Sequence, residues 1–283
     1  MTYDRSRFLG GLGVRVQQDD EEAPPASAIP GMATWWALGD ASGLQPQTGL
    51  PDDATGWDAL DPSTRALAVI ADWEPTVTET NKPSFGDRVV ATPGVSGLVY
   101  DMSAGETTAV GGWTTSSGFV AFRYNDVQPG EVLLMCFNNH FSNRYYGLSV
   151  TGDDHPAIVI RDNTSWSRLY HAATTLVPGT WYTLGFRKAA VDPPDEDGVP
   201  QLFLDGSELT GLTQDLATYA ATAWLNTVTQ KPSAFSIAGR LTNEATRELN
   251  YAADVSIESY GWTPDVLSPA NMATIASEKT HEA

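Results

Sequence analysis

The fold is decided by the stretch Gly179-Thr180-Trp181-Tyr182-Thr183-Leu184-Gly185-Phe186-Arg187-Lys188. Within it, Tyr182, Leu184 and Phe186 occupy every second position, which is the period of a half-buried β-strand. The next apolar run, Leu202-Phe203-Leu204, leads into Asp205-Gly206. That dipeptide is typical of a tight hairpin turn, in which both central residues need positive φ. The two stretches together predict a strand followed by a β-hairpin.

Further strand signals recur at short intervals on both sides of this stretch. They are apolar or alternating runs bounded by turn residues, at 97–102, 118–124, 131–137, 145–151, 157–161, 167–171, 180–188, 200–204, 234–240 and 252–262. Many short strands with few helical segments predict an all-β, antiparallel sandwich of two sheets. A chain of 283 residues is long enough to bury such a core, and we expect residues 31–283 to form a single sandwich.

Two segments have a helical period instead. Residues 268–279 begin with Ser268 as N-cap and Pro269 in the first turn, and an apolar stripe follows, so we expect a short C-terminal helix there. Residues 61–70 begin with Asp61-Pro62 and predict a second short helix. This second helix falls within residues 44–92, which are otherwise rich in proline and read as a loop-rich insertion.

The charge and apolar pattern of the chain exclude several partners. With 35 acidic and 16 basic residues, the formal net charge is −19, which disfavours nucleic acid and anionic membrane surfaces. No stretch approaches the roughly 20 apolar residues that span a bilayer, and the first residues lack the apolar core of a secretory signal. The single cysteine, Cys136, lies in an apolar run, so we expect a buried thiol and no internal disulfide.

Residues 1–30 are predicted to form an extended arm. A basic, glycine-rich start is followed by acidic and then proline-rich sequence, which cannot pack a core on its own. We expect this arm to dock on a partner subunit or on a neighbouring copy of the chain. The side chains expected to make the contact are basic or apolar: Arg5, Arg7, Phe8, Leu9, Leu12 and Arg15.

Four pieces of sequence follow one another in a recognisable order. They are Trp36-Ala37-Leu38-Gly39-Asp40-Ala41-Ser42-Gly43, the strand that starts at Gly179-Thr180-Trp181, the hairpin at Leu202-Phe203-Leu204-Asp205-Gly206, and a last strand at 254–262 followed by Leu267-Ser268-Pro269-Ala270. Together they resemble the laminin-G/concanavalin A-like superfamily of lectin-type sandwiches. The resemblance implies a jelly-roll fold. It does not imply one function, because this fold hosts lectins, adhesion modules, hydrolases, lyases and viral surface proteins.

The resemblance also implies where catalytic residues would lie. Hydrolases of this fold carry Glu-x-Asp-x-x-Glu on one strand, whereas this chain has Asp254-Val255-Ser256-Ile257-Glu258. We interpret that segment as an ordinary alternating strand with Val255 and Ile257 in the core. The Gln-x-His strand of alginate-lyase relatives is missing, and the four histidines occur singly, without metal-ligand spacing: His140, His155, His171 and His281. The sequence therefore predicts no catalytic residues and no enzyme.

Two polar segments with aromatic residues are the candidates for a glycan site. Their candidate contact residues are Asn138, Asn139, His140, Asn143, Tyr145, Trp166 and Arg168. The alternative is that the aromatic rings pin polar hairpins to the sheet. No cofactor is expected, and calcium is the one ion considered, with the acidic residues Asp153, Asp154 and Asp162 as weak candidate ligands.

These features predict a non-enzymatic surface protein of a phage virion, such as a capsid decoration, a fibre or a tail-associated protein. Laminin-G-type modules generally act outside cells, and a virion protein folds in the host cytoplasm and leaves by lysis without an export signal. The expected partners are other virion proteins, further copies in a homo-oligomer and host surface glycans. The alternatives are a lectin or a polysaccharide-active enzyme, hydrolase or lyase, on the same fold, and a cytoplasmic structural protein.

Overall fold

The computed structural model describes the backbone of most of the chain from residue 35 to residue 277. The described ranges are 35–38, 56–58, 66–71, 84–86, 89–93, 96–102, 104–125, 130–139, 144–163, 166–189, 200–215, 232–243, 248–250 and 254–277. The predicted arm, residues 1–30, lies outside them, and so do its contact residues Arg5 to Arg15.

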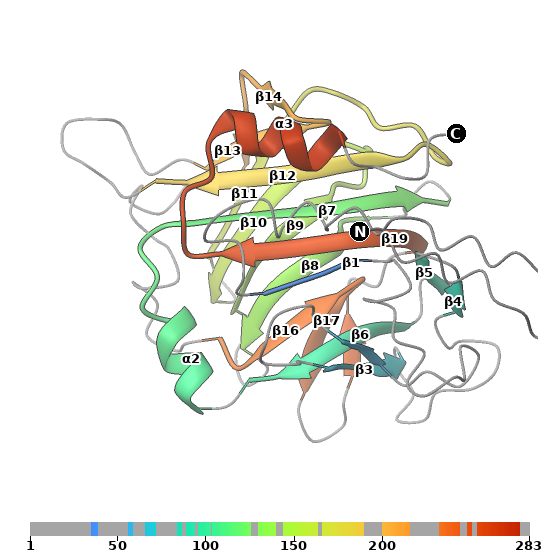
Figure 1. Cartoon of the computed structure of the whole chain (residues 1–283), viewed down its shortest axis with the longest axis vertical. Coiled ribbons are helices and arrows are strands. Elements are labelled where there is room, and N and C mark those ends of the chain that lie inside the picture. The colour runs from blue at the N-terminus through green and yellow to red at the C-terminus, as the bar shows by residue number, and fades with distance from the viewer. Residues whose placement is uncertain are drawn as a thin grey trace, which may run out of the picture.

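Two antiparallel sheets form a sandwich (Figure 1). Sheet A has the order β14 (Ser207–Leu209), β13 (Gln201–Leu204), β12 (Tyr182–Lys188), β7 (Ser116–Tyr124), β19 (Asp254–Thr263), β5 (Val89–Pro93) and β4 (Ser84–Gly86), and β1 (Trp35–Leu38) also pairs with β19. The predicted strand and hairpin at 179–209 are confirmed as β12, β13 and β14. The turn between the last two has φ of 50° at Asp205 and 77° at Gly206.

Sheet B lies on the other side of the core. Its order is β15 (Thr213–Asp215), β11 (Trp166–His171), β10 (Pro156–Asn163), β9 (Arg144–Val150), β8 (Val132–Asn139), β16 (Ala234–Ile237), β6 (Ser96–Asp101), β3 (Ala66–Ala71) and β2 (Gly56–Asp58). A separate two-stranded ribbon, β17 (Arg240–Asn243) and β18 (Glu248–Asn250), follows β16. The prediction of an all-β, antiparallel, two-sheet sandwich is confirmed.

Aromatic side chains fill the space between the sheets. Trp262 of sheet A is fully buried, with ring centroids 4.8 Å from both Phe137 and Phe186 and 6.4 Å from Phe235. Such edge-to-face contacts suit the charge distribution of aromatic rings. Gly118 leaves the room that this packing needs, because a Cβ there would lie 2.7 Å from the Phe186 ring.

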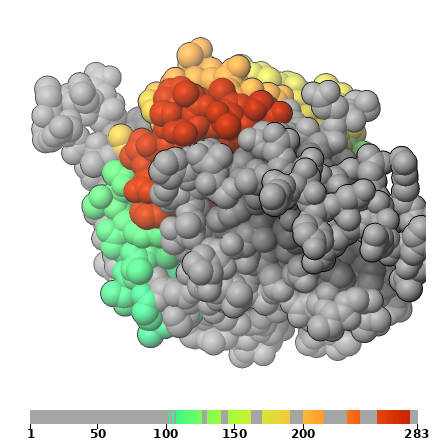
Figure 2. Space-filling view, in the orientation of Figure 1, coloured from blue at the N-terminus to red at the C-terminus, as the bar shows by residue number. Residues whose placement is uncertain are grey.

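The C-terminal helix covers the outer side of sheet A. This helix, α3 (Pro269–Ser277), is confirmed, with the Ser268 hydroxyl accepting a hydrogen bond of 3.1 Å from the Asn271 amide. Its buried residues are Met272, Ile275 and Ala276. Figure 2 shows α3 in red on the outside of the molecule. Among the described residues, no helix is long and apolar enough to cross a membrane.

The helix predicted at 61–70 is wrong. Residues Ala66–Ala71 form strand β3 and pair with β6 instead. The β-branched pair Val69-Ile70 fits a pleated surface, and pairing with a neighbouring strand overrides the local capping signal at Asp61-Pro62. A short helix occurs elsewhere, as α2 (Ala104–Val110), and was not predicted. Strands β2 to β5 also lie within or beside the predicted loop-rich segment, and they extend both sheets.

Candidate functional site

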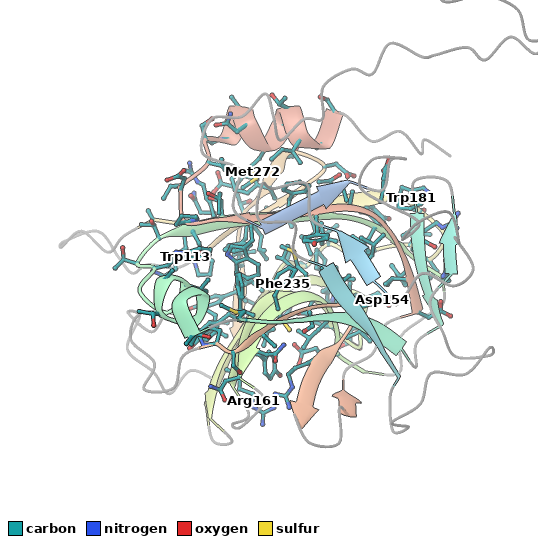
Figure 3. The ribbon with its side chains drawn as sticks, turned by 60° about the horizontal axis from the view of Figure 1, so that its bottom comes forward. Trp113, Asp154, Arg161, Trp181, Phe235 and Met272 are labelled. Carbon is teal, nitrogen blue, oxygen red and sulfur yellow. The ribbon has the colours of Figure 1, made fainter. Side chains whose placement is uncertain are left out.

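The outer face of sheet B, which points away from the sandwich core, carries a second buried cluster. Strands β9 and β10 send Tyr146, Leu148, Ile158 and Ile160 into the main core. The alternate positions belong to the outer face, where Tyr145 and Val159 pack with Leu133 and Cys136. Figure 3 shows Arg161 on this side of the sheet, away from the core residue Phe235.

Gly147 lies at the centre of this outer face. It is the register partner of both Cys136 on β8 and Val159 on β10. A Cβ at this position would overlap the Met135 carbonyl oxygen and the Cys136 side chain, next to the register shift between Leu133 and Met135. The absence of a side chain at Gly147 therefore lets the strands approach closely.

Two arginines approach the ring of Tyr145. The guanidinium carbon of Arg240 lies 4.6 Å from the ring centroid, and that of Arg161 lies 5.9 Å from it. Arg240 reaches this position because the chain bends after β16, where Ala238 and Gly239 have φ of 58° and 146°. The bend brings β17 beside β8. Tyr145 is 1% exposed and Arg240 is 6% exposed, so the cation–π contact of Arg240 is largely desolvated, whereas Arg161 is half-buried.

Asn138 extends the site at the end of β8. Its side-chain Nδ2 donates a hydrogen bond of 2.7 Å to the Ser236 hydroxyl, which lies 3.2 Å from the Cys136 sulfur. Asn138 is 1% exposed, yet its Oδ1 accepts no hydrogen bond in the described part of the structure. An unpaired buried acceptor is costly, so this oxygen is suited to a donor brought by a ligand.

Glu131 contributes a carboxyl group at the start of β8. Burial raises the pKa of this carboxyl group, and the nearby Ser149 hydroxyl and the Arg161 and Arg240 guanidinium groups oppose that rise. Burial is the larger effect, so the neutral form is favoured relative to a carboxyl group in water. Its Oε1 is also buried without a hydrogen-bond partner among the described residues.

The outer face of sheet B therefore gathers one aromatic ring, two guanidinium groups, one amide and one carboxyl group, of which Arg161 and Glu131 are partly exposed and the others are buried. These groups hydrogen-bond to hydroxyl and carboxylate oxygens. Cys136 is fully buried, as expected from sequence, and burial raises the pKa of its thiol.

The structure brings together two of the predicted glycan-site residues. Asn138 and Tyr145 are register partners of β8 and β9 on the outer face of sheet B. Asn139 follows Asn138 in β8, so its side chain starts from the opposite side of the sheet. His140 and Asn143 lie outside the described residues. For Trp166 and Arg168 the structure describes the backbone in β11 but not the side chains.

Sequence reasoning missed Arg161, Arg240 and Glu131. The position of Arg161 could have been predicted, because it continues the alternation of Ala157 and Val159 on the outer face of β10. The position of Arg240 could not, because it depends on the bend after β16.

The strand at 254–258 has the predicted alternation. Val255 and Ile257 are fully buried in the core. Asp254 accepts a hydrogen bond of 2.8 Å from the Asn125 side chain, and Glu258, 6% exposed, lies at a register shift between Ile257 and Ser259. The predicted alternation therefore holds up to Ile257, Glu258 lies at a bulge, and the expectation that this segment has no catalytic role stays a prediction.

The calcium candidates are spread over one loop and one strand. Asp153 is exposed, Asp154 has φ of 61° in the turn before β10, and Asp162 lies in β10. Within the described part of the chain, no three or more His, Cys, Asp or Glu residues are grouped as metal ligands would be. Calcium binding stays a prediction.

Comparison with known proteins places the chain by its fold. No family model matches it, and no curated protein matches it. Among solved structures, Trypanosoma rangeli sialidase in complex with 2,3-difluoro-KDN has a TM-score of 0.54 at 12% identity, over 87% of this chain and 32% of that one. The same sialidase in complex with sialic acid has a TM-score of 0.51, also at 12% identity, over 86% of this chain and 32% of that one.

A smaller structure covers less of this chain. The CBM40 of Ruminococcus gnavus IT-sialidase, bound to α2,3 sialyllactose, has a TM-score of 0.47 at 14% identity, over 64% of this chain and 92% of that one. This chain thus spans about a third of the Trypanosoma sialidase. At these identities the likeness concerns the fold, which is a two-sheet antiparallel sandwich.

Proposed function

We propose that this chain is a carbohydrate-binding sandwich that recognises a saccharide on the outer face of sheet B. The observation that carries the proposal is Asn138, which is buried but leaves Oδ1 without a hydrogen-bond partner among the described groups. A sugar hydroxyl that donates to this oxygen would remove a cost of about 1–3 kcal/mol.

The neighbouring groups suit the same class of ligand. Sugar hydroxyl groups both donate and accept hydrogen bonds, so they can pair with the amide of Asn138, the carboxyl group of Glu131 and the guanidinium groups of Arg161 and Arg240. A mainly apolar base with a few convergent polar groups is typical of ligand sites, and Tyr145, Val159 and Cys136 supply that base. Two solved structures of similar fold are those of a sialidase, which motivates a carbohydrate as the ligand class.

We assign binding without catalysis. Retaining and inverting glycosidases need two carboxyl groups across the scissile bond. Among the side chains described on the outer face of sheet B, Glu131 is the one carboxylic acid, and the rest of the cluster is aromatic, basic or neutral. The role as a phage virion surface protein, with residues 1–30 as docking arm, stays a prediction from sequence, and the binding proposal does not depend on it.

A pair of arginine variants tests the site. Wild-type protein is screened on a glycan array, and the affinity for the best ligand is measured by titration calorimetry. Because a hydrogen bond to a charged group contributes about 1.5–3 kcal/mol, Arg161→Ala should weaken binding by about tenfold or more. The matched control is Arg187→Ala, because Arg187 lies 5.9 Å from the Phe203 ring on sheet A, the same distance as Arg161 from Tyr145.

The control variant should bind like wild type. The proposal fails if wild-type protein binds no glycan on the array, or if Arg187→Ala weakens binding as much as Arg161→Ala does. If the bound glycan is cleaved during long incubation, the assignment of binding without catalysis is wrong, while the location of the site is retained.

A further inference from the structure

A hydrogen-bond relay connects Asn138 to Ser236, Cys136 and Gly239. Nδ2 of Asn138 donates to the Ser236 hydroxyl at 2.7 Å, and Oγ of Ser236 lies 3.2 Å from the Cys136 sulfur. That sulfur lies 3.8 Å from the Gly239 carbonyl oxygen and 3.7 Å from Nδ2 of Asn138. The three side chains of the relay are each at most 1% exposed, so the relay is shielded from solvent.

Strand pairing in sheet B brings the members of the relay together. Ser236 of β16 is the register partner of Cys136 on β8, and Ala234 is the register partner of Asn138. The side chains of Ser236 and Asn138 are therefore diagonal neighbours on one face of the sheet. The last member comes from the bend after β16, where Gly239 has φ of 146°, a backbone conformation that favours glycine.

The Gly239 carbonyl oxygen fixes the direction in which the relay donates. A carbonyl oxygen only accepts and a thiol has one hydrogen, so the Cys136 S–H donates to Gly239. The Cys136 sulfur then accepts from the Ser236 O–H, and the Ser236 oxygen accepts from an N–H of Asn138. Burial raises the pKa of the Cys136 thiol, so the thiol keeps the hydrogen on which this order depends.

The same order determines the orientation of the Asn138 amide group. If the amide were turned over, Oδ1 would need a donor, but the single hydrogen of the Ser236 hydroxyl is already given to Cys136. Nδ2 therefore faces Ser236 and Cys136, and Oδ1 accepts no hydrogen bond from the described residues. An acceptor held in this way can pair with an O–H or N–H group of a ligand, whereas an ether or carboxylate oxygen would leave it unpaired.

We propose that Ser236 is a positioning residue that makes the saccharide site on sheet B selective for a hydrogen-bond donor at Asn138. This inference rests on the saccharide-binding function proposed above. Ser236 is fully buried and acts through Asn138, because it holds the amide with Oδ1 as the group left to the ligand. Without the Ser236 hydroxyl, the amide can turn over and present Nδ2, so that a ligand atom that only accepts is tolerated.

The first test measures this selectivity by titration calorimetry. The probes are the methyl β-glycosides of glucose, galactose and N-acetylglucosamine, and analogues in which one hydroxyl is replaced by fluorine, which removes the donor and nearly keeps the size. For one hydroxyl, the replacement should weaken binding to wild type by about tenfold or more. In Ser236→Ala the loss at that hydroxyl should fall below about threefold.

Three further variants separate positioning from packing. Ser236→Thr keeps the hydroxyl and should retain the selectivity of wild type. Cys136→Ala removes the acceptor of the Ser236 O–H, so the amide can turn over and the selectivity should fall as in Ser236→Ala. Ser116→Ala is the matched control, because Ser116 of sheet A is as fully buried as Ser236 and loses the same atom. It should bind like wild type.

A second measurement needs no saccharide. Hydrogen exchange of the Asn138 side-chain NH2 group, followed by nuclear magnetic resonance in the full-length protein, should be about threefold or more faster in Ser236→Ala than in wild type or Ser116→Ala. Equal exchange rates overturn the inference, and so does unchanged selectivity in folded Ser236→Ala and Cys136→Ala. Wild-type protein that binds no saccharide overturns the proposed function and this inference together, whereas retained binding with unchanged selectivity overturns this inference alone.

Discussion

The outer faces of the two sheets differ in the side chains that cover them, which are apolar on sheet A and partly charged on sheet B. On sheet A, Met272 of α3 packs over Gly185, whose register partners Phe119 and Phe203 are each 1% exposed. On sheet B, the corresponding central glycine, Gly147, lies beside a cluster that includes Arg161, Arg240, Glu131 and Asn138. Apolar cover stabilises a sheet directly, whereas burying charges costs several kcal/mol per ion before any pairing.

The difference indicates that the outer face of sheet A serves the stability of the fold, whereas the outer face of sheet B has a composition that stability alone does not explain. The cover of sheet A follows the local rules for a stable fold: a capped helix with an apolar stripe on an apolar surface. The outer face of sheet B departs from those rules by burying the Arg240 guanidinium group, an unpaired amide oxygen of Asn138 and a carboxyl group with a raised pKa. Such departures concentrate at functional sites, which is why we place the ligand there.

The largest loss in free energy of unfolding should come from replacing the central glycine of an outer face by alanine, Gly147 on sheet B or Gly185 on sheet A. Gly147→Ala places its Cβ against the Met135 backbone carbonyl, which cannot move without breaking the β8–β9 ladder, and we expect a loss of about 3 kcal/mol or more. Gly185→Ala meets the flexible thioether of Met272 at 3.1 Å and should cost less. Urea unfolding measures both.

Gly130→Ala is the control for this pair of glycine variants, because no atom lies within 4 Å of its Cβ position. It should leave the free energy of unfolding nearly unchanged. Equal losses for Gly147→Ala and Gly185→Ala would mean that the two faces are equally tightly packed.

A smaller loss is expected when the apolar cover of sheet A is thinned. Met272→Ala removes a side chain that is 2% exposed, and truncation of a buried methionine to alanine costs about 2–5 kcal/mol; we expect the lower part of that range, because α3 can settle onto Gly185. Thermal and urea unfolding measure the loss, with exposed Thr274→Ala on the same helix as control. Glycan affinity should stay at the wild-type value, and a parallel loss of affinity would show that the faces are not independent.

The smallest effect, and one of opposite sign, is expected at Glu131. Its native pKa is raised by burial, while the unfolded value is about 4.3. When the pH rises above the pKa of the unfolded chain, the unfolded chain releases this proton more readily than the native chain does. The contribution of Glu131 to the free energy of unfolding therefore falls as the pH rises. Glu131→Gln should therefore be slightly more stable than wild type at pH 7.

The difference between Glu131→Gln and wild type should shrink to nothing near about pH 3, more than one unit below the unfolded pKa, where both states keep the proton. Urea unfolding at the two pH values checks this. A variant that is less stable than wild type at pH 7 would mean that the attraction of Arg161 and Arg240 outweighs burial, so that Glu131 acts as their ion-pair partner.

The parts of the fold that sequence could predict are those with a local cause. The alternation of Tyr182, Leu184 and Phe186 and the Asp205-Gly206 turn determine β12 to β14, and Ser268 with the apolar stripe determines α3. The strand β3 could not be predicted, because residues 66–71 extend only where β6 offers a ladder. Its local sequence is compatible with a helix.

The candidate site could be predicted only in part, for the same reason. Asn138 and Tyr145 were placed together because they flank one connection between strands. Because strand β8 continues to Asn139, the side chains of Asn138 and Asn139 start from opposite faces of the sheet. Arg240 reaches Tyr145 through the bend at Ala238 and Gly239, and nothing in the neighbouring residues indicates what that bend approaches.

The position of β19 has a consequence for how the chain folds during synthesis. This strand is hydrogen-bonded to β7, β5 and β1, all of which are translated long before it. Until the ribosome has released residues 254–263, sheet A exists as separate pieces with open edges, and Phe137, Phe186 and Phe235 lack Trp262 between them. The sandwich must therefore close after most of the chain has been made, and in that interval its exposed edges need protection from pairing with other chains.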